Sequence, residues 1–360
     1  MEFAGIKAQQ SRIRARVDAR IARVLDHGEF IRGPEVLELE CALAGFTDIS
    51  YCVSCGNGTD ALQIALMALG IGPGDEVIVP AFSFFATAEA VCLVGATPVF
   101  ADVDATTALI DIDEVSRCIG PRTRAVIPVS LYGQCADHAS LEALAARHAI
   151  TVIEDAAQSF GATQHGRRSC SLSRIACTSF FPSKPLGCYG DGGAIFTVDP
   201  DLHTRMLALS QHGQTRRYLH ETIGMNSRLD TLQAAVLLEK LAILDEELGA
   251  RQRVAQWYDA ALTGSGAGLP LIVAGNTSAW AQYTLRLDVR DRVAGELREA
   301  GIPTAIHYPR PLHLQPALVR SPGLARSESL ARSVLSLPMH PYLARDDVEQ
   351  IAAAVIRALR

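Results

Sequence analysis

The sequence predicts an α/β fold with a mostly parallel sheet, followed by a smaller α+β domain. Between residues 51 and 198, short apolar runs alternate with helical patterns, which is typical of a parallel sheet with connecting helices. Beyond about residue 200, this alternation gives way to long helical patterns and then to a short mixed segment. Since 360 residues are enough for two domains, we expect a large domain over 1–245, including an N-terminal helix, and a small domain over 246–360.

The elements of the large domain follow in chain order. Apolar residues at helical spacing predict a first, amphipathic helix that stops near Gly28, and Gly33-Pro34 begins a second helix with proline at its first position. The apolar positions of the first helix are Ile13, Val17, Ile21, Val24 and Leu25. The expected strands are 51–54, 76–79, 98–101, 125–129, 151–154, 176–181 and 194–198, and helical segments such as 60–69 and 139–149 lie between them.

The second part of the chain reads differently. Helical patterns run from 229 to about 262, and a break rich in glycine and serine follows at 264–268. The tail predicts a strand over 282–287, a helix over 290–300, a strand over 303–308 and a terminal helix from 346. We therefore expect a small α+β domain attached by long helices.

Composition excludes several classes of protein. A net charge of −6 is not the electrostatic footprint of a nucleic-acid-binding protein. No run of eighteen apolar residues occurs in the sequence, and the N-terminus is too polar for a signal peptide. The nine cysteines include one C-x-x-C pair, Cys52 and Cys55, without a second pair at metal-ligand spacing. We expect structural thiols, no metal site, no nucleic-acid or membrane partner, and a cytoplasmic protein.

Lysine is rare in this chain. It occurs at Lys7, Lys184 and Lys240, and all other basic residues are arginines. Lys184 lies in a loop after an apolar strand, among glycines and prolines, whereas Lys240 is expected on an exposed helix face. A lysine amine that is shielded from water loses its charge more easily and becomes a nucleophile toward carbonyl groups. Lys184 is therefore a candidate catalytic residue.

Two further segments follow predicted strands. The run 56–60 (GNGTD) ends a strand and opens a helix, whose free N–H groups and dipole could bind a phosphate, although a plain turn explains it equally well. The run 151–158 is an apolar strand that ends in acids, at the sheet edge where open α/β folds bind ligands. Asp155 could hold a ribose, a metal or a protonated ring nitrogen, or could simply cap a helix.

Together, a lysine, an acid and an anion site are what pyridoxal phosphate (PLP) requires. The lysine forms a Schiff base, the acid keeps the pyridine nitrogen protonated, and the anion site binds the phosphate. Phe82, Phe84 and Phe85, at the end of the next strand, can supply an apolar partner for the ring.

Several stretches of this sequence also match a known family. They are Gly58-Thr59-Asp60-Ala61-Leu62, Gly72-Pro73-Gly74-Asp75-Glu76-Val77, Glu154-Asp155-Ala156-Ala157-Gln158, Ser179-Phe180 with Lys184, Gly190 to Gly193, Asn226-Ser227-Arg228-Leu229-Asp230 and His307-Tyr308-Pro309. In these stretches the chain resembles the DegT/DnrJ/StrS family of PLP-dependent nucleotide-sugar aminotransferases, over essentially its whole length. The common order of the segments makes the resemblance specific, unlike any one of them alone.

The resemblance implies a fold and a set of cofactor contacts. The fold would be PLP-dependent transferase fold type I, that of the aspartate aminotransferase superfamily. Lys184 would form the Schiff base and then move the proton during transamination. Asp155 would pair with the pyridinium nitrogen, Gln158 would lie near the ring hydroxyl, and Phe84 would stack on the ring.

The phosphate contacts that the resemblance implies come from two subunits. Gly58, Thr59 and Ser179 would bind the phosphate in one subunit, joined by Asn226 of the partner. The expected assembly is therefore a homodimer with shared active sites.

The resemblance also suggests the substrates. The loop around Lys184 is similar to that of enzymes that aminate C3 of a UDP-N-acetyl-3-oxo-glucuronate with L-glutamate, for bacterial surface polysaccharides. In those relatives, residues matching Arg228, His307 and Tyr308 contact the sugar nucleotide, and Arg228 could pair with the uronate carboxylate. Arg228 could instead be a core arginine tied to Asp230 or to a helix end.

Arg310 is a separate hypothesis, drawn from its place in a proline-broken loop. It lies three residues after His307, where a guanidinium could face a diphosphate or a carboxylate.

Other functions remain open at this stage. They are an aminotransferase for a 4-keto dTDP- or UDP-sugar, a PLP enzyme without transamination, and a PLP-binding sensor. Lys184 in place of the histidine found in dehydrating relatives favours transamination. A nicotinamide dehydrogenase is excluded by context, because the run 190–193 precedes a strand, whereas the dinucleotide fingerprint follows a strand and opens a helix.

Overall fold

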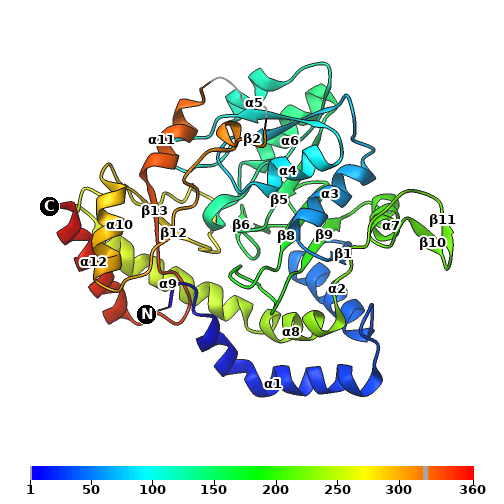
Figure 1. The fold of residues 1–360 in the computed structure, drawn as a ribbon, viewed down its shortest axis with the longest axis horizontal. Helices are drawn as coiled ribbons and strands as arrows, with labels where there is room; N and C mark the ends of the chain where they lie inside the picture. The colour runs from blue at the N-terminus through cyan, green and yellow to red at the C-terminus, as the bar shows by residue number, and fades with distance from the viewer. Residues whose placement is uncertain (1, 319–322) are drawn as a thin grey trace.

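A seven-stranded sheet forms the centre of the computed structural model, which describes residues 2–318 and 323–360 (Figure 1). Its strand order is β1-β9-β8-β5-β4-β2-β3, and β9 runs antiparallel to both neighbours while the other pairs are parallel. The strands are β1 (Tyr51–Cys55), β2 (Glu76–Pro80), β3 (Thr97–Ala101), β4 (Thr123–Val126), β5 (Thr151–Asp155), β8 (Ile175–Ser179) and β9 (Gly193–Thr197). The predicted α/β class with a mostly parallel sheet is confirmed.

Helices cover both faces of this sheet, because its strands carry apolar side chains on both sides. One face packs against α3 (Gly58–Ala68), α4 (Ala86–Leu93) and α7 (Pro200–Leu209). The other face packs against α2 (Pro34–Thr47) and α8 (Thr231–Leu241) at one end and against α5 (Ile112–Cys118) and α6 (His138–His148) at the other. The N-terminal helix, α1 (Ile6–His27), lies outside α8 and buries Ile13, Val17 and Val24, whereas Leu25 is exposed.

The C-terminal part has a core of its own, between residues 254 and 358. It consists of α9 (Leu244–Leu262), β12 (Tyr283–Arg286), α10 (Arg290–Glu299), α11 (Ala325–Ser333), β13 (Val334–Leu337) and α12 (Arg345–Leu359). Short pieces elsewhere are β6 (Thr163–Gln164), β7 (Arg167–Arg168), β10 (Gln214–Arg216), β11 (Leu219–His220) and the 3₁₀ turns Leu131–Gly133 and Leu312–Leu314. None of the helices in residues 2–318 and 323–360 is long and apolar enough to cross a membrane.

One predicted strand is wrong. Residues 303–308 form no strand and pair only through a single bridge between Ala305 and Ser336. The partner of β12 is instead β13, a fully buried run of four residues that follows α11 directly. Pro303, which has no N–H to donate, disfavours a regular ladder in this segment.

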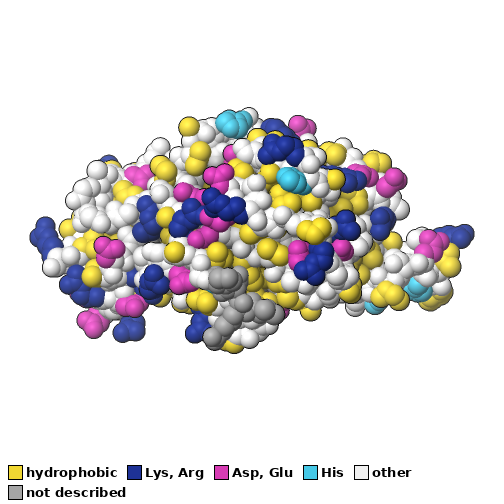
Figure 2. Space-filling view, turned by 90° about the horizontal axis from the view of Figure 1, so that it is seen from above, with side chains coloured by type: hydrophobic (Ala, Val, Ile, Leu, Met, Phe, Trp, Pro, Cys, Tyr) yellow, Lys and Arg dark blue, Asp and Glu magenta, His cyan; other side chains and the backbone are white. Residues whose placement is uncertain are grey.

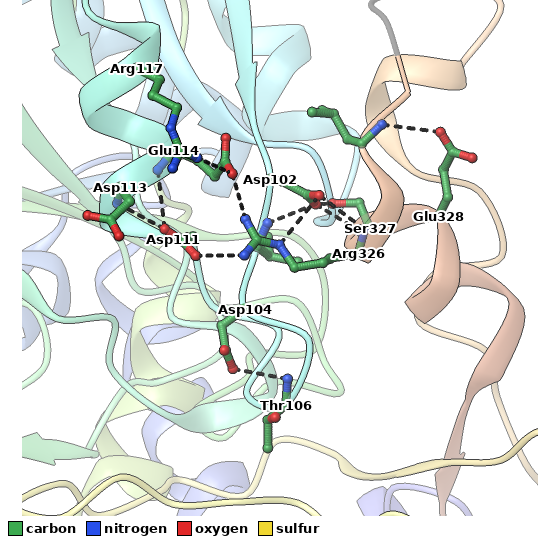
Figure 3. A network of polar contacts seen from close by, with 12 residues as sticks. Asp102, Asp104, Thr106, Asp111, Asp113, Glu114, Arg117, Arg326, Ser327 and Glu328 are labelled. Carbon is green, nitrogen blue, oxygen red and sulfur yellow. Dashed lines mark hydrogen bonds and ion pairs between the residues drawn. The ribbon is translucent and has the colours of Figure 1, made fainter.

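Polar contacts attach α11 to the large sheet, as Figure 3 shows. The Asp102 carboxylate accepts hydrogen bonds from the backbone N–H groups of Arg326 (3.0 Å) and Ser327 (2.9 Å) at the start of α11. The Arg326 guanidinium reaches Asp111 and Glu114, each at 2.9 Å. These contacts, which we call the α11 clasp, fix β13 relative to the sheet because β13 continues α11 without a break.

Charge is mixed on the surface of the molecule. Figure 2 shows acidic and basic side chains interspersed over one face, and a projection at one end. The same projection is seen in Figure 1, where the β10–β11 hairpin extends from the body.

Lys240 does not lie on an exposed face, and the prediction that it does is wrong. Its side chain is 1 % exposed, because α8 is enclosed between α1 and α2. Nζ lies 4.4 Å from the centre of the Tyr189 ring and forms no hydrogen bond within the described residues. Burial lowers the pKa of Lys240 to about 8, because water no longer stabilises the ammonium.

The variant Lys240→Met tests this burial. Methionine keeps an unbranched side chain without the charge, so at pH 7 the variant is expected to exceed the wild type in free energy of unfolding. The excess is up to about 3 kcal/mol, reduced by the lost contact with the Tyr189 ring. Between pH 8 and 10.5 the unfolded wild type holds a proton that the folded form has released, so wild-type stability rises relative to the variant.

Urea unfolding of both proteins at pH 7 and pH 10 measures the change. The exposed Lys7 supplies the control Lys7→Met, whose stability difference from the wild type is expected to stay constant. If the stability difference between Lys240→Met and the wild type were also the same at pH 7 and pH 10, the burial of a charged amine at Lys240 would be contradicted.

Candidate active site

The candidate site lies at the edge of the sheet where the parallel strands end. β5 ends at Asp155, α3 begins just beyond β1, and the loop after β8 carries Lys184. The segment 305–308 reaches this edge from the C-terminal part and contacts Gln158 and Tyr132. The parallel sheet thus gathers residues that are far apart in the sequence, as open α/β sheets do at their ligand sites.

Asp155 is a buried carboxylate, 5 % exposed. Oδ2 accepts a hydrogen bond from Thr87 Oγ1 at 3.1 Å, and Oδ1 accepts one from the backbone N–H of Ala157 at 3.1 Å. Burial raises the pKa of Asp155, against the opposing effects of these hydrogen bonds and of the Lys184 charge. Within the described residues it forms no ion pair, so a cationic ring nitrogen would supply the missing partner.

Lys184 is held by a compact loop. Its backbone N–H donates to Phe181 O at 2.9 Å, and a Cβ at Gly187 would lie 2.6 Å from that same oxygen. The turn therefore needs glycine at 187. Burial lowers the pKa of the Lys184 amine, opposed by the charge of Asp155, so the neutral, nucleophilic form is easier to reach.

A cradle for an anion forms where α3 begins. Asn57 Oδ1 accepts a hydrogen bond from Asp60 N at 2.9 Å and caps the helix. A Cβ added to Gly58 would lie 2.7 Å from Ser179 Cβ, so the first turn of α3 lies directly against Ser179. Free N–H groups, a helix dipole and a serine hydroxyl meet here, which is a donor set that fits a phosphate.

Gly193 makes this cradle possible. It pairs with Cys55 of β1 on one side and with Ser179 of β8 on the other. A Cβ at this position would lie 2.5 Å from the carbonyl carbon and oxygen of Asn57. The acid, the amine and the cradle together fit PLP.

A chain of hydrogen bonds connects the sheet edge to the segment 305–308. Gln158 Oε1 accepts from Tyr132 N at 2.8 Å, and Gln158 Nε2 donates to the Tyr308 hydroxyl at 3.1 Å. The Tyr132 hydroxyl donates to His307 O. The rings of Phe84 and Tyr308 are 5.9 Å apart, and Phe84 is 55 % exposed toward open space. His307 and Tyr308 therefore lie beside Tyr132 and Gln158, and the contacts with a sugar nucleotide that the resemblance implies stay predictions.

Arg228 is half-buried, next to Ser227, whose hydroxyl accepts a hydrogen bond from Gly56 N at 2.9 Å just before α3. Its Nε is buried without a hydrogen-bond partner, and no ion pair with Asp230 occurs within the described residues. The interpretation of Arg228 as a core arginine paired with Asp230 therefore has no support. An orphaned guanidinium nitrogen is instead what a site for an anionic substrate group would leave before that group binds.

Within the described residues, no side-chain hydrogen bond or ion pair joins Asn226 or Arg310 to this set. Both are exposed, Asn226 beside Gln211 near the base of the β10–β11 hairpin and Arg310 in the loop that follows Pro309. Thr87, Tyr132 and Ser336 are polar partners that the sequence did not identify. Tyr132 has a backbone φ of 59°, a conformation that a non-glycine residue rarely adopts and that nothing in its sequence neighbourhood signals.

The fold and the site define an aminotransferase of PLP fold type I. Residues 11–356 match the model of the DegT/DnrJ/EryC1/StrS aminotransferase family, and the chain belongs to that family. It is a sugar aminotransferase, and its cofactor is PLP.

Three relatives illustrate the similarity. The UDP-2-acetamido-2-deoxy-3-oxo-D-glucuronate aminotransferase of Pseudomonas aeruginosa is 56% identical over 99% of both chains. DesV of S. venezuelae, solved in complex with a ketimine intermediate, is 44% identical, with a TM-score of 0.97 over 100% of this chain and 98% of that one. The Bacillus subtilis protein ntda, solved with its cofactor PMP, is 30% identical, with a TM-score of 0.89 over 99% and 85%.

The variant Gly193→Ala tests the cradle. The added methyl group must displace Asn57 and the start of α3, so we expect the affinity for PLP to fall about tenfold or more. Titration of the apoenzyme with PLP, followed by absorbance, measures this change. Gly45→Ala is the matched control, since a Cβ there meets no atom within 4 Å, and its affinity should equal that of the wild type. Equal affinity in a folded Gly193→Ala protein would contradict the cradle.

Proposed function

We propose that this enzyme transfers the amino group of L-glutamate to C3 of UDP-N-acetyl-3-oxo-glucuronate, in the synthesis of bacterial surface polysaccharides. The main support is the 56% identity, over nearly the whole chain, to the P. aeruginosa aminotransferase named for that substrate. The unpartnered Nε of Arg228 beside the site agrees with an acceptor that carries a carboxylate.

Different residues are proposed to bind each part of the cofactor. We propose that Gly58, Thr59 and Ser179 bind the phosphate, together with Asn226 of a partner subunit. Gln158 would hold the ring hydroxyl, and Phe84 would cover one face of the ring. PLP, when bound, supplies an electron sink for the carbon that loses or gains the amino group.

Two ionisable side chains, Asp155 and Lys184, would carry the proton chemistry. Asp155, which is buried and forms no ion pair within the described residues, would keep the ring nitrogen protonated. Nζ of Lys184, whose pKa is lowered by burial, would accept the proton from Cα of glutamate and later deliver one to C3 of the sugar. One residue thus serves both half-reactions as base and acid.

The acceptor contacts are proposed on the C-terminal side of the site. Arg228 would pair with the uronate carboxylate, and His307 and Tyr308 would contact the sugar. Arg310 is exposed and would reach the diphosphate from the loop at the rim.

We also propose the homodimer with shared sites. Large apolar side chains are exposed around the site, among them Phe84 at 55 % and Phe181 at 52 %. The β10–β11 hairpin exposes Tyr218 at 81 %, and the segment that follows it exposes Ile223 at 86 %. Exposed apolar surface of this kind is typical of a protein interface, and a second copy of the chain would cover it and bring in Asn226.

Two further proposals concern the domain boundary and the location of the protein in the cell. The separate core between residues 254 and 358 supports a division into domains at residues 245 and 246. The nine cysteines form no disulfide in the structure, which supports a cytoplasmic location.

The direct test is turnover with both substrates. Wild-type enzyme with L-glutamate and the UDP-3-oxo-uronate should yield 2-oxoglutarate and the 3-amino sugar, identified by mass spectrometry and NMR. Lys184→Ala should lower kcat at least about a thousandfold, whereas Lys7→Ala, at an exposed site, should not. Full turnover by Lys184→Ala would refute the assignment, and preference for a 4-keto sugar would refute the substrate.

Arg228→Lys tests the uronate contact. Lysine keeps the charge but loses the bidentate geometry, so kcat/KM for the uronate acceptor should fall about tenfold to a hundredfold. The matching acceptor with CH₂OH in place of the carboxylate should be affected less than threefold. The exposed Arg332 gives the control Arg332→Lys. An equal loss for both acceptors would show that Arg228 does not bind the carboxylate.

A further inference from the structure

Two buried hydroxyl groups lie behind the His307 ring. Ser336 Oγ is 2.9 Å from His307 Nδ1, and Thr284 Oγ1 is 2.9 Å from Ser336 Oγ. Ser336 is 0 % exposed and Thr284 is 5 % exposed. Thr284 and Ser336 face each other directly in the β12–β13 ladder.

These hydroxyls are not needed to build the C-terminal core. Their strand neighbours Tyr283, Leu285, Leu335 and Leu337 all belong to that apolar core, so Thr284 and Ser336 point to the other face of the two-stranded ladder. That face meets the segment 305–308, since Ser336 pairs with Ala305 through two backbone hydrogen bonds. Buried hydroxyls are costly unless hydrogen-bonded, and here their partner is a ring at the active site.

Counting the available protons assigns the direction of the hydrogen bonds between His307, Ser336 and Thr284. If Nδ1 carries the ring proton, it donates to Ser336 and Ser336 donates to Thr284, whose own proton then has no acceptor in the described residues. In the opposite direction Thr284 donates to Ser336 and Ser336 donates to Nδ1. Both hydroxyl protons are then used, and the ring proton lies on Nε2.

The His307 backbone is held by a separate contact, and the His307 ring is neutral. The Tyr132 hydroxyl donates to His307 O, and Tyr132 N in turn donates to Gln158 at the sheet edge. Burial, with the nearby Lys184 charge, lowers the pKa of His307 to about 4. In a neutral imidazole the tautomer decides which nitrogen can donate. Within the described residues, Nε2 forms no hydrogen bond.

We propose that Thr284 and Ser336 are positioning residues that hold His307 as the Nε2–H tautomer, so that Nε2–H donates a hydrogen bond to an oxygen of the sugar nucleotide. The identity of this ligand rests on the proposed function, whereas the tautomer does not. A donor at this place fits an acceptor that presents hydroxyl, carbonyl and phosphate oxygens.

The first test reads the tautomer directly. Holoenzyme with ¹⁵N-labelled histidine is examined by long-range ¹H–¹⁵N correlation at pH 7, and His307 is assigned by the signals that disappear in His307→Phe. The wild type should show a protonated Nε2 and an unprotonated Nδ1. In Ser336→Ala, Nδ1 loses its donor, and we expect a mixture of tautomers. A protonated Nδ1 in the wild type, or an unchanged tautomer in Ser336→Ala, would overturn the proposal.

The second test is kinetic and uses graded variants. Ser336→Ala should raise KM for the UDP-sugar acceptor about fivefold to tenfold, with kcat changed less. Thr284→Val leaves the Ser336 hydroxyl in place and should raise KM about twofold. The control Ser333→Ala, whose hydroxyl only bonds backbone oxygens of its own helix, should match the wild type. Equal KM values for Ser336→Ala and Ser333→Ala would also overturn the proposal.

The two tests separate this inference from the proposed function. If the enzyme does not accept the UDP-3-oxo-uronate, the wild type and all variants show no turnover of this acceptor. The NMR spectrum still reports the tautomer of His307 in that case. If turnover is as proposed but Nδ1 carries the proton, the function stands and the positioning role is lost. Thermal unfolding of each variant shows whether a loss of activity is merely a loss of fold.

Discussion

The site depends on a buried carboxylate, that of Asp155, which forms no ion pair within the described residues. Asp155 accepts hydrogen bonds from Thr87 and Ala157, and these leave it with acceptor capacity to spare. Burying an ion costs several kcal/mol even after relaxation, and the raised pKa of Asp155 expresses that cost although the Lys184 charge opposes it. Burial has the opposite effect on Lys184, because it lowers the pKa of the amine. In the proposed binding mode, the protonated ring nitrogen of PLP would pair with Asp155 and its carbonyl carbon would react with Lys184, so cofactor binding would recover part of the free energy that burying these two groups costs.

The sheet topology explains why Gly193 lies against three segments, which are β1, β8 and the backbone of Asn57 before α3. Because β9 is reversed, its first residue, Gly193, lies at the edge where β1 and β8 end, between Cys55 and Ser179. The backbone of Asn57 can then pass over Gly193, and α3 begins against Ser179. A fully parallel sheet would place the start of that strand at the far edge. The reversal therefore contributes to the phosphate cradle as directly as the polar groups that line it.

The sequence pattern correctly predicted those parts of the fold that depend on residues close together in the chain. The strands between residues 51 and 198, and the places of Asp155 and Lys184 at their ends, follow from apolar runs and glycine turns. The errors share one cause, which is contact between distant segments. Lys240 is buried only because α1 returns over α8, and β13 is a strand only because it meets β12. Ser336 likewise meets Thr284 across 52 positions, a pairing that no spacing rule reveals.

In the proposed function, the PLP contacts within one subunit and the acceptor contacts of His307 and Tyr308 come from different parts of the chain, while Arg228 adds an acceptor contact from the large domain. The residues that fit PLP within one subunit lie between 58 and 184, on the sheet edge, whereas His307 and its supports Thr284 and Ser336 belong to the C-terminal part. The α11 clasp joins the two, since it fixes the helix that continues into β13 (Figure 3). If these proposed roles hold, substitutions in the C-terminal part are expected to alter the sugar that is accepted more than the cofactor contacts of Asp155, Lys184 and the proposed phosphate cradle. Such a division allows one fold to serve many sugars, because function resides in a site that the scaffold carries.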